Sequence, residues 1–252
     1  MSQRLALVTG AASGIGEAIA RRLVRDGCHV VVVDKQSEAG KRVADQVGGT
    51  FLEADLTSRC NCRHVIEETV RSHQRVDILI NNAGFQHIDP IEAFPEEIWE
   101  QMIAVMLTAP FVLTKHAWPA MKKNGWGRVV NLASVLGKAG TPYKAAYVSA
   151  KHGLVGLTKC AAFEGGPFGI TVNAICPGYV RTPLMEGQIA DQARTHQMKA
   201  KDVIEKVMLE RTAVKRLIEP AEIADLVGYL CSDSASSITG ATLSIDQGWT
   251  AS

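Results

Sequence analysis

Short apolar runs alternate along the chain with stretches in which apolar residues recur every three or four positions. Uninterrupted apolar runs of this kind are typical of parallel strands buried on both faces, and the longer period indicates amphipathic helices. The runs predict strands at Leu5–Val8, Val30–Val33, Phe51–Ala54, Val76–Ile80, Arg128–Leu132, Ile170–Ile175 and Ala241–Ile245. The intervening stretches predict helices at Ile15–Arg25, Ser37–Val47, Cys60–Ser72, Glu96–Met121, Ala146–Glu164 and Pro220–Leu230.

This order of elements predicts an α/β protein with a single-domain Rossmann fold, in which helices cover both faces of a doubly wound, seven-stranded parallel sheet. No linker, charge block or repeat divides the chain, so we expect one domain over residues 1–252. The segment 182–211 is polar, rich in Met and Gln and only loosely helical, which indicates a small mobile substrate lid. Pro110 lies inside the long helical stretch and is expected to kink it.

Composition narrows the classes of function. The 252 residues carry a net charge of +1 without clustered Lys or Arg, so we expect a small-molecule substrate and neither nucleic acid nor an anionic membrane as partner. The chain shows no signal-peptide pattern and no apolar run long enough to span a bilayer, which predicts a cytoplasmic protein.

Six cysteines without repeated spacing indicate reduced thiols. The cluster Cys60-Asn-Cys62-Arg-His64 lacks a second ligand pair with zinc spacing, so no metal is expected.

A glycine-rich turn after the first strand is the first candidate site. It reads Thr9-Gly10-Ala-Ala-Ser13-Gly14-Ile15-Gly16 and leads directly into a predicted helix. There, backbone amides and the positive end of the helix can face a pyrophosphate without Cβ atoms between them. A glycine turn by itself can be purely structural, but its position after the first strand favours a dinucleotide site.

Asp34 ends the second predicted strand, eighteen residues after Gly16. A carboxylate at this place accepts both hydrogen bonds from the adenosine ribose hydroxyls of NAD and repels the 2′-phosphate of NADP. Lys35 offers some help to NADP, whereas Ser13 stands where an NADP enzyme often has a basic residue. We therefore expect NAD as the cofactor.

Tyr147 and Lys151 lie four residues apart at the start of a predicted helix. Side chains at this spacing share one helix face, which places an ammonium beside a phenol. A free tyrosine, with a pKa of about 10, is a poor base at neutral pH, but an adjacent cation and the charged nicotinamide ring favour the phenolate. The spacing suits an acid-base pair, although a surface pair has the same spacing.

Five motifs together resemble those of the short-chain dehydrogenase/reductase family, and the match covers essentially the whole chain. They are the turn from Thr9-Gly10 to Gly16, Asn81-Asn82-Ala83-Gly84, Ser134, Tyr147-x-x-x-Lys151 and Pro177-Gly178. The resemblance implies a hydride transfer to or from a secondary alcohol, with Ser134, Tyr147 and Lys151 as the catalytic residues. It implies that Ser134 hydrogen-bonds the reacting oxygen and that Lys151 also binds the nicotinamide ribose.

The same resemblance assigns residues along the cofactor. It implies that Asp55 contacts the adenine, that Asn82 lies along the cleft and that Thr182 holds the nicotinamide carboxamide. The plainer alternatives are helix caps at Asp55 or Thr182 and a tie at the sheet edge at Asn82. The residues expected to bind NAD are Gly10, Ser13, Gly14, Ile15, Gly16, Asp34, Asp55, Leu56, Asn82, Ala83, Gly84, Tyr147, Lys151, Pro177, Gly178, Val180 and Thr182.

One position departs from the family pattern. The family usually has an asparagine in the long fourth helix, which holds a water that connects the lysine to solvent, and Met106 takes its place here. A methionine side chain cannot hold that water. Either backbone groups hold the relay, proton transfer is slower, or activity is lost.

Within the family, three stretches resemble the bacterial D-3-hydroxybutyrate dehydrogenases: Asn81-Asn-Ala-Gly-Phe-Gln-His87, Ala174-Ile-Cys-Pro-Gly-Tyr-Val-Arg-Thr-Pro-Leu184 and Gly248-Trp-Thr-Ala251. The likeness implies that Gln86, Lys144 and Gln188 bind the substrate carboxylate and that His87 is structural or lies at the pocket rim. A small acid in a cleft does need a cation and fixed donors, and Lys144 lies about one helical turn before Tyr147. A solvated loop lysine is the alternative.

Two further positions depart from the hydroxybutyrate pattern. Leu136 replaces a histidine that faces the carboxylate, and Tyr179 replaces a tryptophan that packs on the substrate. Losing a donor weakens carboxylate binding, and an apolar Leu136 admits a longer or less polar chain.

The working hypothesis is oxidation of (R)-3-hydroxybutyrate, or a closely related short 3-hydroxy acid, to its keto acid. Alternative substrates are a neutral diol, acetoin or a cyclic alcohol, for which Lys144 is incidental, and acetoacetyl-CoA, whose reduction commonly uses NADPH. A non-catalytic NAD-binding sensor is the alternative from another class, motivated by Met106. A methyltransferase is excluded because its chemistry would not require a serine, a tyrosine and a lysine at these positions.

The family resemblance also implies a homotetramer, with the helices at Glu96–Met121 and Ala146–Glu164 at one interface.

Overall fold

A seven-stranded parallel sheet forms the centre of the protein, seen in a computed structural model that describes residues 3–183, 185–187, 189 and 199–251. Its strands are β1 (Leu5–Thr9), β2 (His29–Asp34), β3 (Thr50–Glu53), β4 (Ile78–Asn81), β5 (Gly127–Leu132), β6 (Ile170–Pro177) and β7 (Thr242–Ile245). Their order is β3-β2-β1-β4-β5-β6-β7, and every pairing is parallel. The predicted α/β fold and all seven predicted strands are confirmed.

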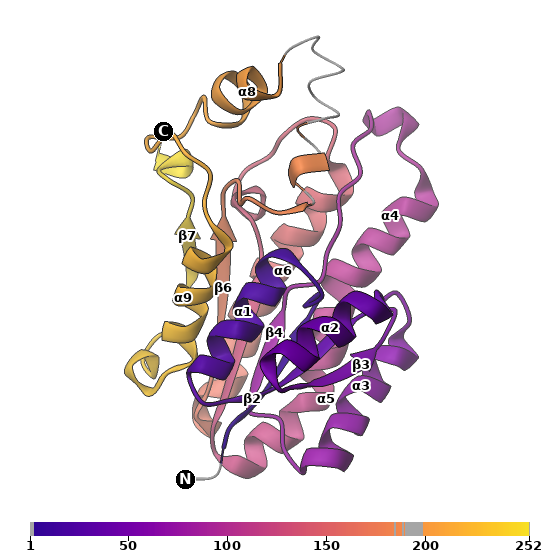
Figure 1. The fold of residues 1–252 in the computed structure, drawn as a ribbon, viewed down its shortest axis with the longest axis vertical. Coiled ribbons are helices and arrows are strands. Elements are labelled where there is room, and N and C mark those ends of the chain that lie inside the picture. The colour runs from indigo at the N-terminus through magenta and orange to yellow at the C-terminus, as the bar shows by residue number, and fades with distance from the viewer. Residues whose placement is uncertain (1–2, 184, 188, 190–198, 252) are drawn as a thin grey trace.

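Helices cover both faces of the sheet (Figure 1). They are α1 (Gly14–Arg25), α2 (Ser37–Val47), α3 (Arg59–His73), α4 (Glu96–Ile103), α5 (Ala109–Asn124), α6 (Ala145–Gly165), α8 (Ala200–Val203) and α9 (Pro220–Cys231). Side chains alternate between the faces: Ala6 and Val8 of β1 pack with α1, α2 and α9, whereas Leu5 and Leu7 pack with α3, α5 and α6. Because both faces are buried, the strands are apolar throughout, as the sequence indicated. None of the described helices is both long and apolar enough to cross a bilayer.

The long helix predicted over Glu96–Met121 is interrupted. After α4 the chain makes one π-helical turn over Ala104–Thr108, and α5 then begins at Ala109 with Pro110 in its first turn. Proline lacks a backbone N–H and fits best where a helix begins, because the first amides of a helix have no partner inside it. The irregular turn therefore lies immediately before Pro110.

The point where the strand order reverses positions the site. β1 pairs with β2 on one side and with β4 on the other. The connection after β1 and the connection after β4 therefore leave in opposite directions along the sheet. In sheets of this type, ligands bind at the carboxyl ends of the strands beside such a point. The C-terminus and α8 lie at the end of the molecule opposite the N-terminus (Figure 1).

The segment predicted as a lid, 182–211, is described only in part. Its described residues include α8 and a π-helical turn at Ile204–Met208. An apolar cluster of Met185, Ile189, Val203, Met208, Leu209 and Leu217 packs there, with Tyr179 at its edge. Gln188 lies outside the described residues. The closing motion of this segment stays a prediction.

Candidate active site

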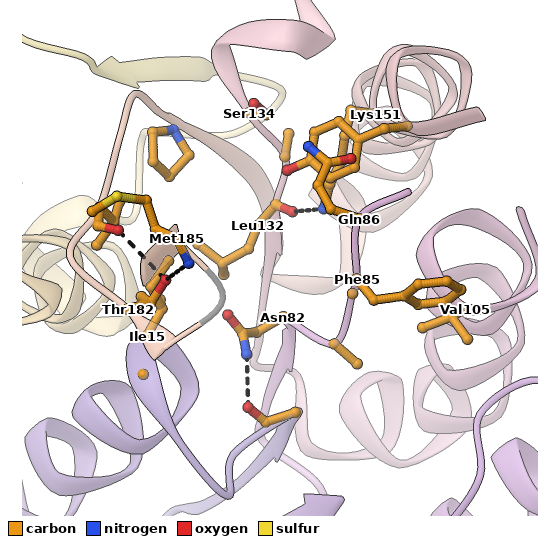
Figure 2. Close-up of a pocket in the computed structure, with 18 of the residues that line it drawn as sticks. Ile15, Asn82, Phe85, Gln86, Val105, Leu132, Ser134, Lys151, Thr182 and Met185 are labelled. Carbon is orange, nitrogen blue, oxygen red and sulfur yellow. Dashed lines mark hydrogen bonds between the residues drawn. The ribbon is translucent and has the colours of Figure 1, made fainter. Parts of the chain in front are cut away.

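A cleft of about 680 Å³ opens at the carboxyl ends of the strands. It brings together most of the predicted site residues, namely Gly10, Ser13, Gly14, Ile15, Asp34, Asp55, Leu56, Asn82, Ala83, Gly84, Gln86, Ser134, Lys144, Tyr147, Lys151, Pro177, Gly178, Tyr179, Val180 and Thr182. Figure 2 shows Thr182 and Met185 across the cleft from Gln86 and Lys151. Residues separated by more than a hundred positions thus converge on one cavity.

The glycine-rich turn forms one end of the cleft. Gly10 and Gly14 have φ angles of +62° and +58°, which favour glycine. A Cβ at Gly10 would lie 2.8 Å from Ala83 Cα, so a side chain there would also collide with the end of β4. Ser13, the N-cap of α1, makes no side-chain cap hydrogen bond, which leaves the first amides of α1 available to an anion.

Gly16 has a different role from the other two glycines. It does not line the cleft among the described residues, and a Cβ there would lie 2.1 Å from the Gly10 carbonyl oxygen. Its missing side chain lets α1 pack tightly against the turn. The structure therefore gives Gly16 a supporting place under the predicted cofactor site.

Asp34 is held at the rim beside the turn. Its Oδ2 accepts a hydrogen bond from the Ala12 amide at 3.0 Å, and its Oδ1 accepts one from the Gln36 amide at 3.0 Å. A carboxylate oxygen has more than one lone pair, so both oxygens can still accept a bond from a ligand hydroxyl. The orientation of the carboxylate is set before any ligand arrives.

Asn82 makes the structural tie considered as its alternative, whereas Asp55 accepts its hydrogen bonds in the turn before α3 and does not cap that helix. The Asp55 carboxylate accepts bonds from the Thr57 amide and hydroxyl at 3.0 and 2.9 Å, and these bonds lower the pKa of Asp55. The Asn82 amide donates to the carbonyl oxygens of Thr9 and Gly10 at 2.9 and 3.0 Å, and Figure 2 shows one of these two bonds. Both residues line the cleft while bracing its walls.

Thr182 caps the turn that follows it. Its hydroxyl accepts a hydrogen bond from the Met185 amide at 3.3 Å, and a Cβ added at Gly14 would lie 3.2 Å from its methyl carbon. Thr182 thus stands directly opposite the N-terminus of α1. This place suits contact with a cofactor that runs from the glycine turn toward Tyr147.

Ser134, Tyr147 and Lys151 meet at the other end of the cleft. Ser134 follows β5 and hydrogen-bonds Tyr147, while its own Oγ accepts a bond from the Leu136 amide at 3.1 Å. Lys151 Nζ lies 5.5 Å from the centroid of the Tyr147 ring and donates to the Leu132 carbonyl oxygen at 2.6 Å (Figure 2). The three side chains predicted to be catalytic therefore face one space.

Burial controls the ionisation of this group. It raises the pKa of Tyr147, against the lowering effect of the Ser134 hydrogen bond, and it lowers the pKa of Lys151 to about 8. Desolvation disfavours the charged form of each group. That Lys151 and a charged nicotinamide ring together favour the phenolate stays a prediction.

The predicted carboxylate-binding end contains a buried cation. Lys144 is 9% exposed, makes no ion pair or hydrogen bond with another described side chain, and has its pKa lowered by burial. Gln86 Oε1 is buried without a hydrogen-bond partner in the described part of the chain. Leu136, at 8% exposure, lines the same cavity where the likeness implied a histidine. The place of Gln188 is not described.

Several cleft residues were not predicted from the sequence. They include Phe85, Gln101, Val105, Thr141, Met185 and Trp249. Trp249 follows β7 by four positions, and the carboxyl end of a strand in a parallel sheet was a signal that could have identified it. Gln101 and Val105 come from α4 and the π-helical turn, and their sequence pattern shows only a helix.

Met106 lies behind the cleft rather than in it. It is 1% exposed and packs with Met102, Ala146 and Ala150. A Cβ at Gly84 would lie 3.1 Å from its sulfur, so methionine fills the space under the end of β4. The structure gives Met106 an apolar packing role next to α6.

The Cys60–His64 cluster does not form a metal site in the described residues, where no group of three metal-ligating side chains is found. Cys60 is exposed, whereas the buried Cys62 thiol faces the Leu56 carbonyl oxygen at 3.6 Å. The two thiols therefore have different surroundings at the start of α3.

Known proteins resemble this chain in amino-acid sequence and in fold. A family profile described as enoyl-(acyl carrier protein) reductase matches residues 10–250. A protein of Rhizobium meliloti named D-beta-hydroxybutyrate dehydrogenase is 44% identical over 98% of this chain and 99% of its own, and an uncharacterized oxidoreductase of Bacillus subtilis, YxjF, is 45% identical over the full length of both. A crystal structure of an actinorhodin polyketide ketoreductase with NADPH superposes with a TM-score of 0.93 and 32% identity, covering 98% of this chain and 97% of that one.

These matches extend over nearly the whole chain, and they agree with a cleft in which a serine, a tyrosine and a lysine face the end of a glycine-rich turn. The chain is an oxidoreductase that belongs to the short-chain dehydrogenase/reductase family.

Proposed function

We propose that the protein is an NAD-dependent dehydrogenase that interconverts (R)-3-hydroxybutyrate, or a closely related short 3-hydroxy acid, and its 3-keto acid. Lys144 carries this proposal, because a buried ammonium without a described carboxylate partner is costly unless a ligand supplies the anion. It lines the same cavity as Ser134 and Tyr147. Relatives named D-beta-hydroxybutyrate dehydrogenase at 44% and 37% identity support the same substrate.

The residues present fit a dinucleotide. Gly10 and Gly14 leave a space at the turn that a Cβ would fill, and α1 offers its uncapped amides to a pyrophosphate. Asp34 at the rim would accept the ribose hydroxyls, and its charge favours NAD over NADP, although Lys35 lies beside it. When bound, the cofactor supplies a hydride acceptor or donor at its nicotinamide ring.

The chain's own residues handle the proton of the reaction. Tyr147 takes the hydroxyl proton from the substrate during oxidation and returns it during reduction. Ser134 donates a hydrogen bond to the same substrate oxygen. Lys151, whose pKa is about 8, is largely protonated at neutral pH and stabilises the phenolate as it forms.

A substrate panel tests the proposal. We expect kcat/KM for (R)-3-hydroxybutyrate to exceed that for its methyl ester by roughly tenfold or more, because a charge-assisted bond from Lys144 is lost with the ester. Lys144→Met should abolish this preference and leave the ester rate nearly unchanged. Each substrate is measured with NAD and NADP. Equal efficiency for acid and ester in the wild type would contradict the carboxylate role.

Two alternatives are decided by the same panel. The apolar Leu136 in the cleft favours a neutral substrate such as 2,3-butanediol, acetoin or a cyclic alcohol. A relative from Streptomyces coelicolor named putative ketoacyl reductase, 34% identical, motivates a ketoacyl substrate, and the ketoreductase structure with NADPH motivates that cofactor. Turnover that Tyr147→Phe abolishes would exclude the non-catalytic sensor that Met106 suggested.

A further inference from the structure

Two separate segments carry Gln86 and Lys144, and one backbone hydrogen bond joins them at the cleft rim. The Asp89 amide, three residues after Gln86, donates to the carbonyl oxygen of Tyr143 at 3.0 Å. Lys144 follows Tyr143 directly and begins α6 as its N-cap. The bond therefore connects the loop after β4 to the start of the helix that carries the catalytic tyrosine.

Tyr143 adopts a backbone conformation that its own side chain does not favour. Its φ is +66°, a region that glycine populates freely and aromatic residues rarely enter. The ring is 59% exposed, so packing of the side chain gives little compensation. The conformation turns the Tyr143 carbonyl toward Asp89 immediately before Lys144 enters the cleft.

The Asp89 side of the bond is also braced. His87 Nε2 and Asp89 Oδ2 lie 2.5 Å apart, and both side chains are about one-third exposed, at 34% and 36%. The His87 ring packs edge-on against Phe94, with centroids 5.2 Å apart. Phe94 in turn packs on the apolar cluster around Met102. His87 is thus held between its contact with Asp89 and the ring of Phe94, which lies just before α4.

We propose that His87, Asp89 and Tyr143 form a rim clasp that positions the two carboxylate-binding groups, Gln86 and Lys144. A carboxylate needs its donors at a fixed separation, and displacements of about 1 Å at such groups have large effects. The clasp joins the two segments next to these groups. The strained backbone of Tyr143 is retained there because it sets the position of Lys144. The inference rests on the proposed function, because it assigns the clasp to recognition of the substrate carboxylate.

The ratio of kcat/KM for the hydroxy acid to kcat/KM for its methyl ester measures how well the clasp positions Gln86 and Lys144. This quantity is called the acid-to-ester ratio. Asp89→Ala removes the partner of His87, and we expect the ratio to fall roughly fivefold through KM of the acid, with kcat within about twofold of wild type. Asp89→Asn, which can still accept a hydrogen bond from His87, should restore most of the ratio. Glu92→Ala, an exposed carboxylate on the same loop, is the matched control and should match the wild type.

A second pair of variants tests the backbone. Tyr143→Gly removes both the ring and the strain, whereas Tyr143→Ala removes the ring and keeps the strained conformation. We expect Tyr143→Gly to melt at a higher temperature than Tyr143→Ala, and to have a lower acid-to-ester ratio because the hinge beside Lys144 is freer. This comparison stays informative if Asp89→Ala folds poorly.

The outcomes separate the clasp from the proposed function. If Lys144→Met abolishes the acid preference while Asp89→Ala and Tyr143→Gly leave the ratio unchanged, the clasp is overturned and the proposed function stands. If the wild type shows no acid preference, the proposed function is contradicted, and the clasp, which rests on it, falls with it. A loss of rate that is equal for acid and ester in Asp89→Ala also overturns the clasp, because it indicates a general structural effect.

Discussion

Lys151 has its ammonium in a nearly closed environment. The residue is 4% exposed, and burial lowers its pKa from 10.5 to about 8. The folded chain therefore binds this proton less tightly than the unfolded chain does. Below pH 8 the buried charge reduces stability in full, and between about pH 8 and 10.5 this cost disappears, because the folded form loses the proton first.

Lys151→Met is expected to remove this pH dependence. At pH 7 the lowered pKa reduces the unfolding free energy of the wild type by about 3 kcal/mol. By pH 10.5 the wild type should have regained this amount relative to the variant, whose unfolding free energy does not depend on this group. Urea unfolding of both proteins at several pH values in this window measures the difference. The contribution of Lys151 would be refuted by a difference that stays constant from pH 7 to pH 10.5.

Sequence alone predicted the chemistry of individual residues better than their surroundings. The four-residue spacing of Tyr147 and Lys151 suits an acid-base pair, the family resemblance added Ser134, and all three residues line the cleft. The direction of the Tyr147 pKa was not predictable, because it depends on burial by residues distant in the sequence. Trp249 lies in a stretch that resembles the hydroxybutyrate dehydrogenases, but no role was assigned to it because its contact with the cleft depends on tertiary structure.

At the level of elements, the start of β4 depends on one buried carboxylate. The strand was predicted from Val76 and begins at Ile78, and the Asp77 side chain just before it reaches the start of β1. Asp77 is 1% exposed and accepts bonds from the Leu5 amide at 2.7 Å and from Arg75 Nε at 2.6 Å. It thereby joins the beginnings of two central strands at the end of the sheet opposite the cleft.

Asp77→Ala should destabilise the protein by about 3 kcal/mol or more, because it leaves a buried amide unpaired and Arg75 without this carboxylate. Chemical denaturation of wild type and variant measures the change. Glu53→Ala, an exposed carboxylate on β3, serves as the control and should cost much less. Equal losses in the two variants would show that the Asp77 contacts do not secure the strands.

The break between α4 and α5 shows a limit of pattern reading. Apolar residues keep a helical period through Ala104–Thr108, so the sequence predicted one helix with a kink at Pro110. A π-helical turn inserts its extra residue without disturbing that period enough to be seen. It is nevertheless the turn that brings Val105 to the cleft and Met106 to the packing behind it.

At the scale of the whole molecule, we propose the homotetramer that the family resemblance implied, with α5 and α6 at one interface. Phe111 on α5 and Phe163 on α6 are 50% and 88% exposed. Phe163→Asp should therefore reduce the assembly mass measured by light scattering. A wild-type protein that runs as a monomer would refute the proposal.

The parallel, doubly wound sheet followed from the alternation of elements, since parallel strands require crossover connections and both faces must be covered, whereas the strand order is known only from the structure. The partly described segment 182–211 is the exception. Its polar composition predicted a lid but fixed no contacts, and the packing of Met185 with Met208 depends on tertiary structure.

The cleft walls extend from Gly10 to Trp249, so residues from both ends of the chain enclose one space. A ribosome that has released only the first half of this chain has released the glycine turn but not Ser134, Tyr147 or the wall after β7. A ligand that needs the whole cleft can therefore bind only after almost the entire chain has emerged from the ribosome, and its binding can stabilise the fold only from that point.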